Sequence, residues 1–94
     1  MGEEFTIVIP EGCSISNIGF ATALVEKAST FTSEDISLIV DSKTVDLKSI
    51  LGVITLQYYE GAELKFRVIG EMANYAKDSL TRFVNKLFTL YIKE

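Results

Sequence analysis

The segment KTVDLKSILGV, residues 43–53, decides which fold this chain can adopt. The apolar cluster over residues 50–54 is compatible with a buried strand, but Gly52 is a poor strand residue. Asp46, or the pair Lys48-Ser49, stands before that cluster and is typical of a helix start. We therefore predict that a short strand ends here and a short helix begins.

The periodicity of the flanking sequence predicts the other elements. Residues 4–9 and 62–69 alternate apolar and polar side chains, as half-buried strands do. Residues 17–29 and 71–91 carry apolar side chains at helical spacing. The pair Asp41-Ser42 is typical of a tight turn. In chain order we expect a strand over 4–9, a helix over 17–29, strands over 36–40 and 43–45, a short helix within 46–55, a strand over 62–69 and a helix over 71–91.

This β-α-β-β-α-β-α order predicts an α+β fold. It is an open-faced sandwich in which a four-stranded antiparallel sheet is covered on one face by three helices. No linker or repeat divides the chain, so residues 1–94 are expected to form a single domain. The uncovered face would present Thr6, Val8, Lys65 and Arg67 to solvent. The expected core includes Ala21, Leu24, Val25, Phe66, Val68, Leu80 and Val84, and the last helix would turn Leu87 and Leu90 inward.

Composition excludes several classes of function. The 94 residues are 48% hydrophobic and the formal net charge is −4, which indicates a packed globule without the basic face that nucleic acids require. No polybasic segment favours a membrane surface, and no apolar run has the length of a transmembrane helix. The N-terminal segment is acidic and unlike a signal peptide, so we expect a cytoplasmic protein.

The chemistry available to the chain is narrow. One cysteine and no histidine exclude an internal disulfide and the usual zinc ligand sets, so we expect no metal and no cofactor. Cys13 has no basic neighbour in the sequence that would lower the pKa of its thiol. We expect it to lie outside the core and to tolerate replacement by serine at a cost of no more than about 1 kcal/mol.

Two segments resemble the HPr family, the histidine-containing phosphocarrier proteins of the bacterial sugar phosphotransferase system. ATALVEKAS, residues 21–29, resembles the first helix of the family. Residues 43–53, followed by GAEL at 61–64, resemble the family stretch KTVNxKSIMGV and the turn into its last strand. The resemblance covers nearly the whole chain and implies the open-faced sandwich reached above.

The loop before the first helix departs from the family. There the loop reads approximately GxHARPA, and its histidine receives a phosphoryl group from the phosphoenolpyruvate-dependent enzyme. In EGCSISNIGFA, residues 11–21, that histidine falls on Asn17, the arginine on Gly19 and the proline on Phe20. The loop is slightly longer, so Ser16 is an alternative for the histidine position. An amide is not a nucleophile and a serine ester would be stable, so we expect no phosphoryl relay.

The resemblance also assigns a role to Ser49. In the family this serine is phosphorylated by the bifunctional HPr kinase/phosphorylase, and the neighbouring Ile50, Leu51 and Ile54 form a patch that docks partners. The alternative is that Ser49 only caps the short helix while the apolar cluster faces the core. The sequence leaves both interpretations open.

Three functions are compatible with these observations. The leading hypothesis is a non-catalytic HPr-like regulator or adaptor, similar to the histidine-free catabolite-repression HPr. Its partners would be an HPr kinase/phosphorylase and a transcriptional regulator or metabolic enzyme, and it would be a monomer or a homodimer. A second is a small-molecule or peptide-binding module that uses the solvent-facing sheet or the Tyr58-Tyr59 region. A third, a phosphocarrier with Ser16 or Cys13 as nucleophile, is disfavoured because neither has an evident base nearby.

Overall fold

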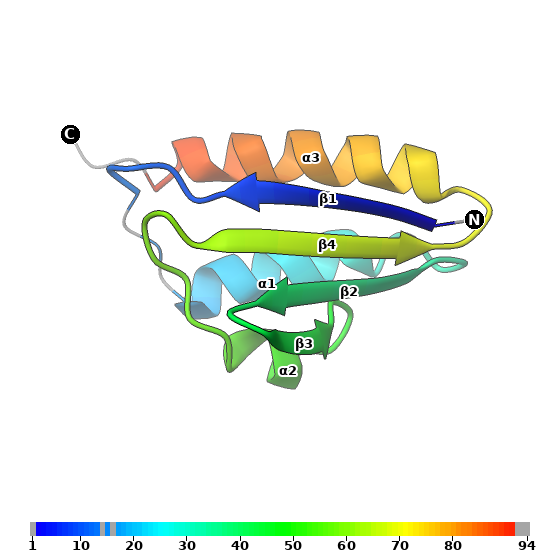
Figure 1. Ribbon diagram of the computed structural model, residues 1–94, viewed down its shortest axis with the longest axis horizontal. Helices are drawn as coiled ribbons and strands as arrows, with labels where there is room; N and C mark the ends of the chain where they lie inside the picture. The colour runs from blue at the N-terminus through cyan, green and yellow to red at the C-terminus, as the bar shows by residue number, and fades with distance from the viewer. Residues whose placement is uncertain (1, 14, 16, 92–94) are drawn as a thin grey trace.

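The computed structural model describes residues 2–13, 15 and 17–91, and within them the chain forms four strands and three helices. The strands pair in the order β1-β4-β2-β3, and every neighbouring pair is antiparallel (Figure 1). The strands are β1 (Gly2–Val8), β2 (Asp35–Val40), β3 (Lys43–Asp46) and β4 (Glu63–Ile69). The helices are α1 (Asn17–Ala28), α2 (Ile50–Ile54) and α3 (Ala73–Thr89).

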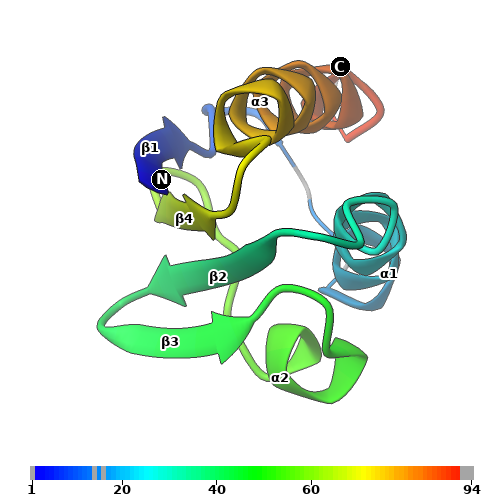
Figure 2. The same ribbon diagram turned by 90° about the vertical axis from the view of Figure 1, so that its right-hand side faces the viewer.

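All three helices lie on one side of the sheet, as Figure 2 shows. In β4 the side chains of Leu64, Phe66 and Val68 are fully buried, because the alternation of the strand turns them toward the helices. The intervening side chains point to the opposite, open face. The predicted α+β open-faced sandwich is therefore confirmed. In the part of the chain that the structure describes, no helix is long and apolar enough to cross a membrane.

The predicted elements are all present. The short helix α2 occupies only residues 50–54 of the predicted range 46–55, and every other end lies within two residues of its predicted position. One of the shifted ends is the start of α3, which begins at Ala73 rather than at residue 71. The side chain of Met72, the N-cap, makes no capping hydrogen bond, and its backbone N–H donates instead to the carboxylate of Glu34 at 3.2 Å. Gly70 approaches this carboxylate so closely that a Cβ there would lie 2.8 Å from Cγ of Glu34. The buried Glu34 thus sets where the helix starts.

Six of the seven expected core residues are buried, and the seventh differs. Val25 is only partly buried and packs against the core from its margin. The expectation for Leu90 was wrong, because α3 ends at Thr89 and Leu90 is 76% exposed. The other six expected core residues are almost fully buried: Ala21, Leu24, Phe66, Val68, Leu80 and Val84.

Phe20 joins α1 to α3 and to the segment before β4. Its ring is fully buried, stacks on Phe88 of α3 with centroids 5.9 Å apart, and meets the edge of Tyr58 at 5.0 Å. A third aromatic ring, that of Tyr91, lies 6.2 Å away. Aromatic rings bury large apolar areas and prefer such stacked and edge-on arrangements. The first turn of α1 is therefore held in place by contacts with α3 and with the segment before β4.

We predict that Phe20→Ala destabilises the protein by about 3–5 kcal/mol, because it leaves a cavity among three rings. The measurement is urea unfolding followed by circular dichroism. The control is Tyr75→Ala, an exposed aromatic on α3, which should cost less than about 1 kcal/mol. Equal losses in the two variants would contradict the central packing role of Phe20.

Candidate functional site

Ser49 is the N-cap of α2. Its backbone is extended, with φ −106° and ψ 108°, and its hydroxyl oxygen accepts a hydrogen bond from the N–H of Gly52 at 3.4 Å. The side chain is half-buried at the junction between β3 and the helix. The capping role that the sequence left open is therefore present in the structure. Phosphorylation of Ser49 stays a prediction.

The apolar residues of α2 divide between the core and the surface. Val53 is fully buried and Ile54 is partly buried against the core. Ile50 is 39% exposed and Leu51 is 77% exposed. The alternative in which the whole cluster faces the core is thus wrong for Ile50 and Leu51. Because a five-residue helix cannot bury every side, it presents part of its apolar surface outward. We call Ser49, Ile50, Leu51 and Ile54 the α2 face.

Contacts from three directions hold α2 in place. The hydroxyl of Tyr58 donates to the carbonyl of Val53 at 2.7 Å, and burial raises the pKa of this tyrosine. The amide of Asn17 donates to the carbonyl of Leu56 at 3.2 Å, just beyond the helix. Gly52 lies against β3, where a Cβ would be 3.2 Å from Cβ of Val45. The position of the α2 face is therefore set by two groups close in sequence, Val45 and Tyr58, and by one distant group, Asn17.

Asn17, the residue at the expected histidine position, is the first residue of α1. Its side-chain nitrogen donates to the segment after α2, so the amide joins α1 to α2 and does not serve as the helix cap by this contact. Gly19 is exposed two residues further on. The alternative position Ser16, and Ser14 beside it, lie outside the described residues. Asn17 thus acts as a structural link in this loop.

Cys13 lies in the core, and the expectation that it would not was wrong. Only 8% of the residue is exposed, and its thiol donates to the carbonyl of Phe88 at 3.7 Å. Burial raises the pKa of the thiol, and the negative charge of Glu60 raises it further. The carboxylate of Glu60 also accepts a hydrogen bond from the N–H of Gly12. The loop therefore folds inward at its one cysteine, which makes a poor nucleophile.

Lys48 lies directly before the cap, and no role for its side chain was predicted from the sequence. Its ammonium group donates to the carbonyls of Phe31 and Glu34, each at 2.6 Å. The carboxylate of Asp46 accepts from the N–H of Lys48 at 2.9 Å. Because lysine is common on protein surfaces, the residue type alone does not indicate this role. The role depends on the α1–β2 connection, which lies close to Lys48 in the fold.

Comparison with known proteins assigns this open-faced sandwich to a class, the proteins of the phosphotransferase system. The family model described as PTS HPr component phosphorylation site matches residues 2–86. The chain therefore belongs to the HPr family. It is 32% identical over 85 residues to the phosphocarrier protein HPr of Lysinibacillus sphaericus, which is 90% of this chain and 92% of that relative.

Solved structures of the family have the same fold. HPr-C-His from Thermoanaerobacter tengcongensis matches with a TM-score of 0.77 and 29% identity, over 93% of this chain and 96% of that one. The catabolite-repression protein Crh of Bacillus subtilis matches with a TM-score of 0.65 and 28% identity, over 85% and 90% of the two chains. That Crh structure is described as a dimer with a swapped domain.

We predict that the thiol of Cys13 reacts slowly with iodoacetamide in the folded protein. Its pKa is raised above the ordinary value of 9.0, so the rate should rise with pH at a higher midpoint than in protein unfolded by urea. The stabilisation from keeping this thiol neutral is complete below the unfolded pKa and is lost as pH rises through the folded pKa. Mass spectrometry of the alkylated protein gives both profiles, and coinciding midpoints would disprove the assignment.

Proposed function

We propose that this HPr-family chain is a regulatory adaptor of the phosphotransferase system and not a phosphocarrier. The observation that carries the proposal is the absence of any histidine among its 94 residues. In the family, the relay of a phosphoryl group uses a histidine, whose imidazole forms a labile phosphorus–nitrogen bond. Without one, the protein can act by binding and by modification.

The first support for this proposal is the loop before α1. Asn17 stands where the family resemblance puts the histidine, and its amide is engaged with the carbonyl of Leu56. Gly19 stands where the resemblance puts the arginine and supplies no cation for a phosphate. Cys13, the one thiol, is buried with a raised pKa. These residues stabilise the loop but offer no group suited to phosphoryl transfer.

The second support is the α2 face. Ser49 lies beside the exposed side chains of Ile50 and Leu51, so one partner surface could contact both a modified serine and an apolar patch. A phosphate adds about −1.5 to −2 charges and three acceptor oxygens, which changes what the face can bind. We propose that modification of Ser49 switches the affinity of this face for its partner.

The proposed partners follow from the family. They are an HPr kinase/phosphorylase, which modifies Ser49, and a transcriptional regulator or metabolic enzyme, which docks on Ile50, Leu51 and Ile54. We propose that the protein acts in the cytoplasm as one domain over residues 1–94. Because Crh is described as a swapped dimer, both a monomer and a homodimer are retained as proposed states.

We predict that an HPr kinase with ATP phosphorylates Ser49 and no other serine, as read by mass spectrometry of peptides. Ser49→Ala should abolish the signal, whereas Ser42→Ala should leave it unchanged. Loss of the cap in Ser49→Ala should cost about 0.5–2 kcal/mol, so thermal unfolding is measured in parallel. A phosphate mapped to Ser14, Ser16 or Ser42 would refute the assignment.

A matched pair of leucines tests the α2 face in the same assay. Leu51 and Leu90 are exposed to almost the same extent, 77% and 76%, but lie on different elements. Leu51→Asp should slow phosphorylation of Ser49 at least about tenfold, the effect of a lost contact of about 1.4 kcal/mol. Leu90→Asp should not, and equal rates for the two variants would exclude the face as the docking site.

We predict that the phosphoenolpyruvate-dependent donor enzyme transfers no phosphoryl group to this protein. Asn17→His alone should restore little labelling, because Gly19 provides no cation and the new ring loses the contact with Leu56. Asn17→His with Gly19→Arg and a shortened loop should accept more. The readout is acid-labile label from radioactive phosphoenolpyruvate.

Two results would count against the predictions on phosphoryl transfer. Labelling of the unmodified protein would overturn the non-catalytic proposal as a whole. Labelling of Ser16→His but not of Asn17→His would show that Ser16 is the histidine-equivalent position, while the regulatory proposal would stand.

A further inference from the structure

The open face of the sheet contains a hollow of about 390 Å³. In Figure 2 this face lies on the side of the sheet away from α2 and the other helices. The hollow lies at the end of the β2–β3 hairpin and crosses β2, β4 and β1. Pairing of Thr6 with Lys65, and of Lys65 with Ile39, forms its floor as one row across the sheet. Its other polar lining residues are Asp41, Ser42, Tyr59 and Glu63.

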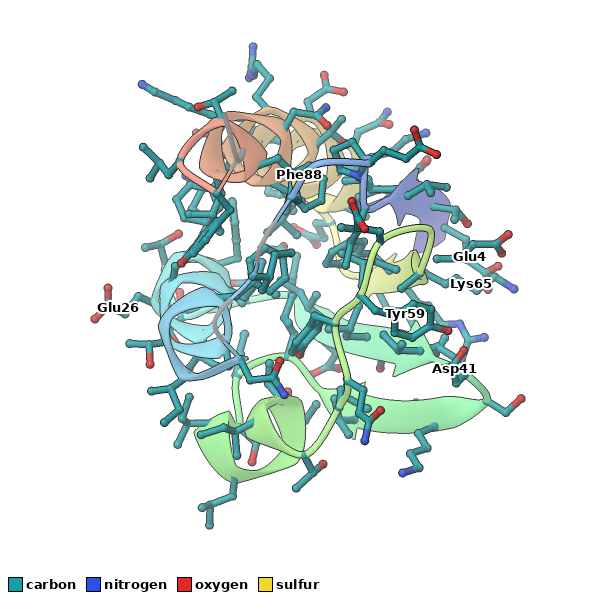
Figure 3. All side chains as sticks on the ribbon, turned by 90° about the vertical axis from the view of Figure 1, so that its left-hand side faces the viewer. Glu4, Glu26, Asp41, Tyr59, Lys65 and Phe88 are labelled. Carbon is teal, nitrogen blue, oxygen red and sulfur yellow. The ribbon has the colours of Figure 1, made fainter. Side chains whose placement is uncertain are left out.

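Tyr59 forms one wall of the hollow. Its hydroxyl donates to both carboxylate oxygens of Asp41, at 2.9 and 3.0 Å, and Figure 3 shows the two side chains together beside the sheet. This bond and the charge of Asp41 raise the pKa of Tyr59, which keeps the phenol a donor. The ring itself remains 47% exposed. A carboxylate is thus fixed beside an accessible aromatic surface.

The turn that carries Asp41 is conformationally unfavourable for its residues. Asp41 and Ser42 have φ values of 50° and 70°, the left-handed conformation that a two-residue hairpin of this kind requires. Asn-Gly or Asp-Gly would adopt it at lower cost, because glycine has no Cβ. The strain is retained at the two turn positions whose side chains line the hollow. Strained backbone of this kind is often found at binding sites.

None of the ion pairs within the described residues includes a charged residue of the hollow's lining, although the charge of Lys65, after the larger effect of Arg67, also helps to lower the pKa of Glu4. The ion pairs found there join Glu4 to Arg67 and Glu3 to Lys77, and neither includes Asp41, Glu63 or Lys65. The lining therefore offers two carboxylates and one ammonium group, together with the face of Tyr59. An ammonium group is attracted both to carboxylates and to an aromatic face, whereas Lys65 attracts a carboxylate.

We propose that this hollow binds a small zwitterion, a molecule that carries an ammonium group and a carboxylate on a short carbon chain. The ammonium group lies against Asp41, Glu63 and the ring of Tyr59, and the carboxylate lies toward Lys65. All of these contacts are open to water, so each contributes little and the dissociation constant is in about the millimolar range. Such binding leaves the α2 face free, so one protein can respond to a metabolite and to a partner separately.

The test uses 4-aminobutyrate and two analogues that each lack one of its two charged groups, butylamine and butyrate. Each is titrated into the full chain at constant ionic strength, and backbone amide shifts are followed by nuclear magnetic resonance. We expect saturable shifts at Ser42, Gly61 and Lys65, strongest for 4-aminobutyrate, weaker for butylamine and weakest for butyrate. Equal shifts for the three probes, or no saturation at tens of millimolar, would overturn the proposal.

Variants connect the binding to the lining residues. Lys65→Met, in β4, should remove the advantage of 4-aminobutyrate over butylamine. Lys43→Met, in β3 next to Ser42 but outside the lining, should leave that advantage unchanged. The double variant Asp41→Asn, Ser42→Gly has turn residues better suited to this turn, so it should melt at an equal or higher temperature. It should nevertheless lose at least threefold in affinity for 4-aminobutyrate. Full binding in that variant would show that the turn side chains do not form the site.

Discussion

The structure depends on the central position of β4, which pairs with β1 on one side and β2 on the other. The strand comes late in the chain, so neither ladder can form until residues far apart in sequence have met. One set of its side chains forms the centre of the core, and Phe66 stacks on Phe5 of β1 at 4.9 Å. The other set lies on the open face. The centre of the core and the floor of the hollow are both positioned by the register of this one strand.

The fold could be predicted because its signals are periodic and local. Alternation over β4 and helical spacing over α3 each record which side faces the core, and the segment before α2 carries a helix start. Residues at the ends of elements were harder, since Val25 and Leu90 satisfy the spacing but lie at the margin of the packed region. The spacing of apolar residues indicates which way a side chain points, but it does not indicate how far the packed layer beneath the helix extends.

The candidate sites were only partly predictable for a related reason. Ser49 could be predicted as a site because both the helix start and the family stretch that it resembles lie within residues 43–53. The burial of Cys13 depends on the carbonyl of Phe88, 75 residues away, and the bond between Tyr59 and Asp41 spans 18 residues. Such contacts have no sequence signal in either partner alone. The turn at Asp41 was expected, but its use as the wall of a hollow requires the whole sheet.

The hydrogen bonds of Lys48 affect whether a negative charge at the next residue, Ser49, would be neutralised. Its ammonium group already serves two carbonyls of the α1–β2 connection, so it is committed to the fold and poorly placed to neutralise a new anion at Ser49. In a chain whose formal charge is already −4, a phosphate would stay electrostatically exposed. Phosphorylated Ser49 would therefore place an uncompensated negative charge beside the exposed apolar side chains of α2. Selectivity follows, because only a surface that brings its own arginine or lysine next to an apolar pocket can satisfy both.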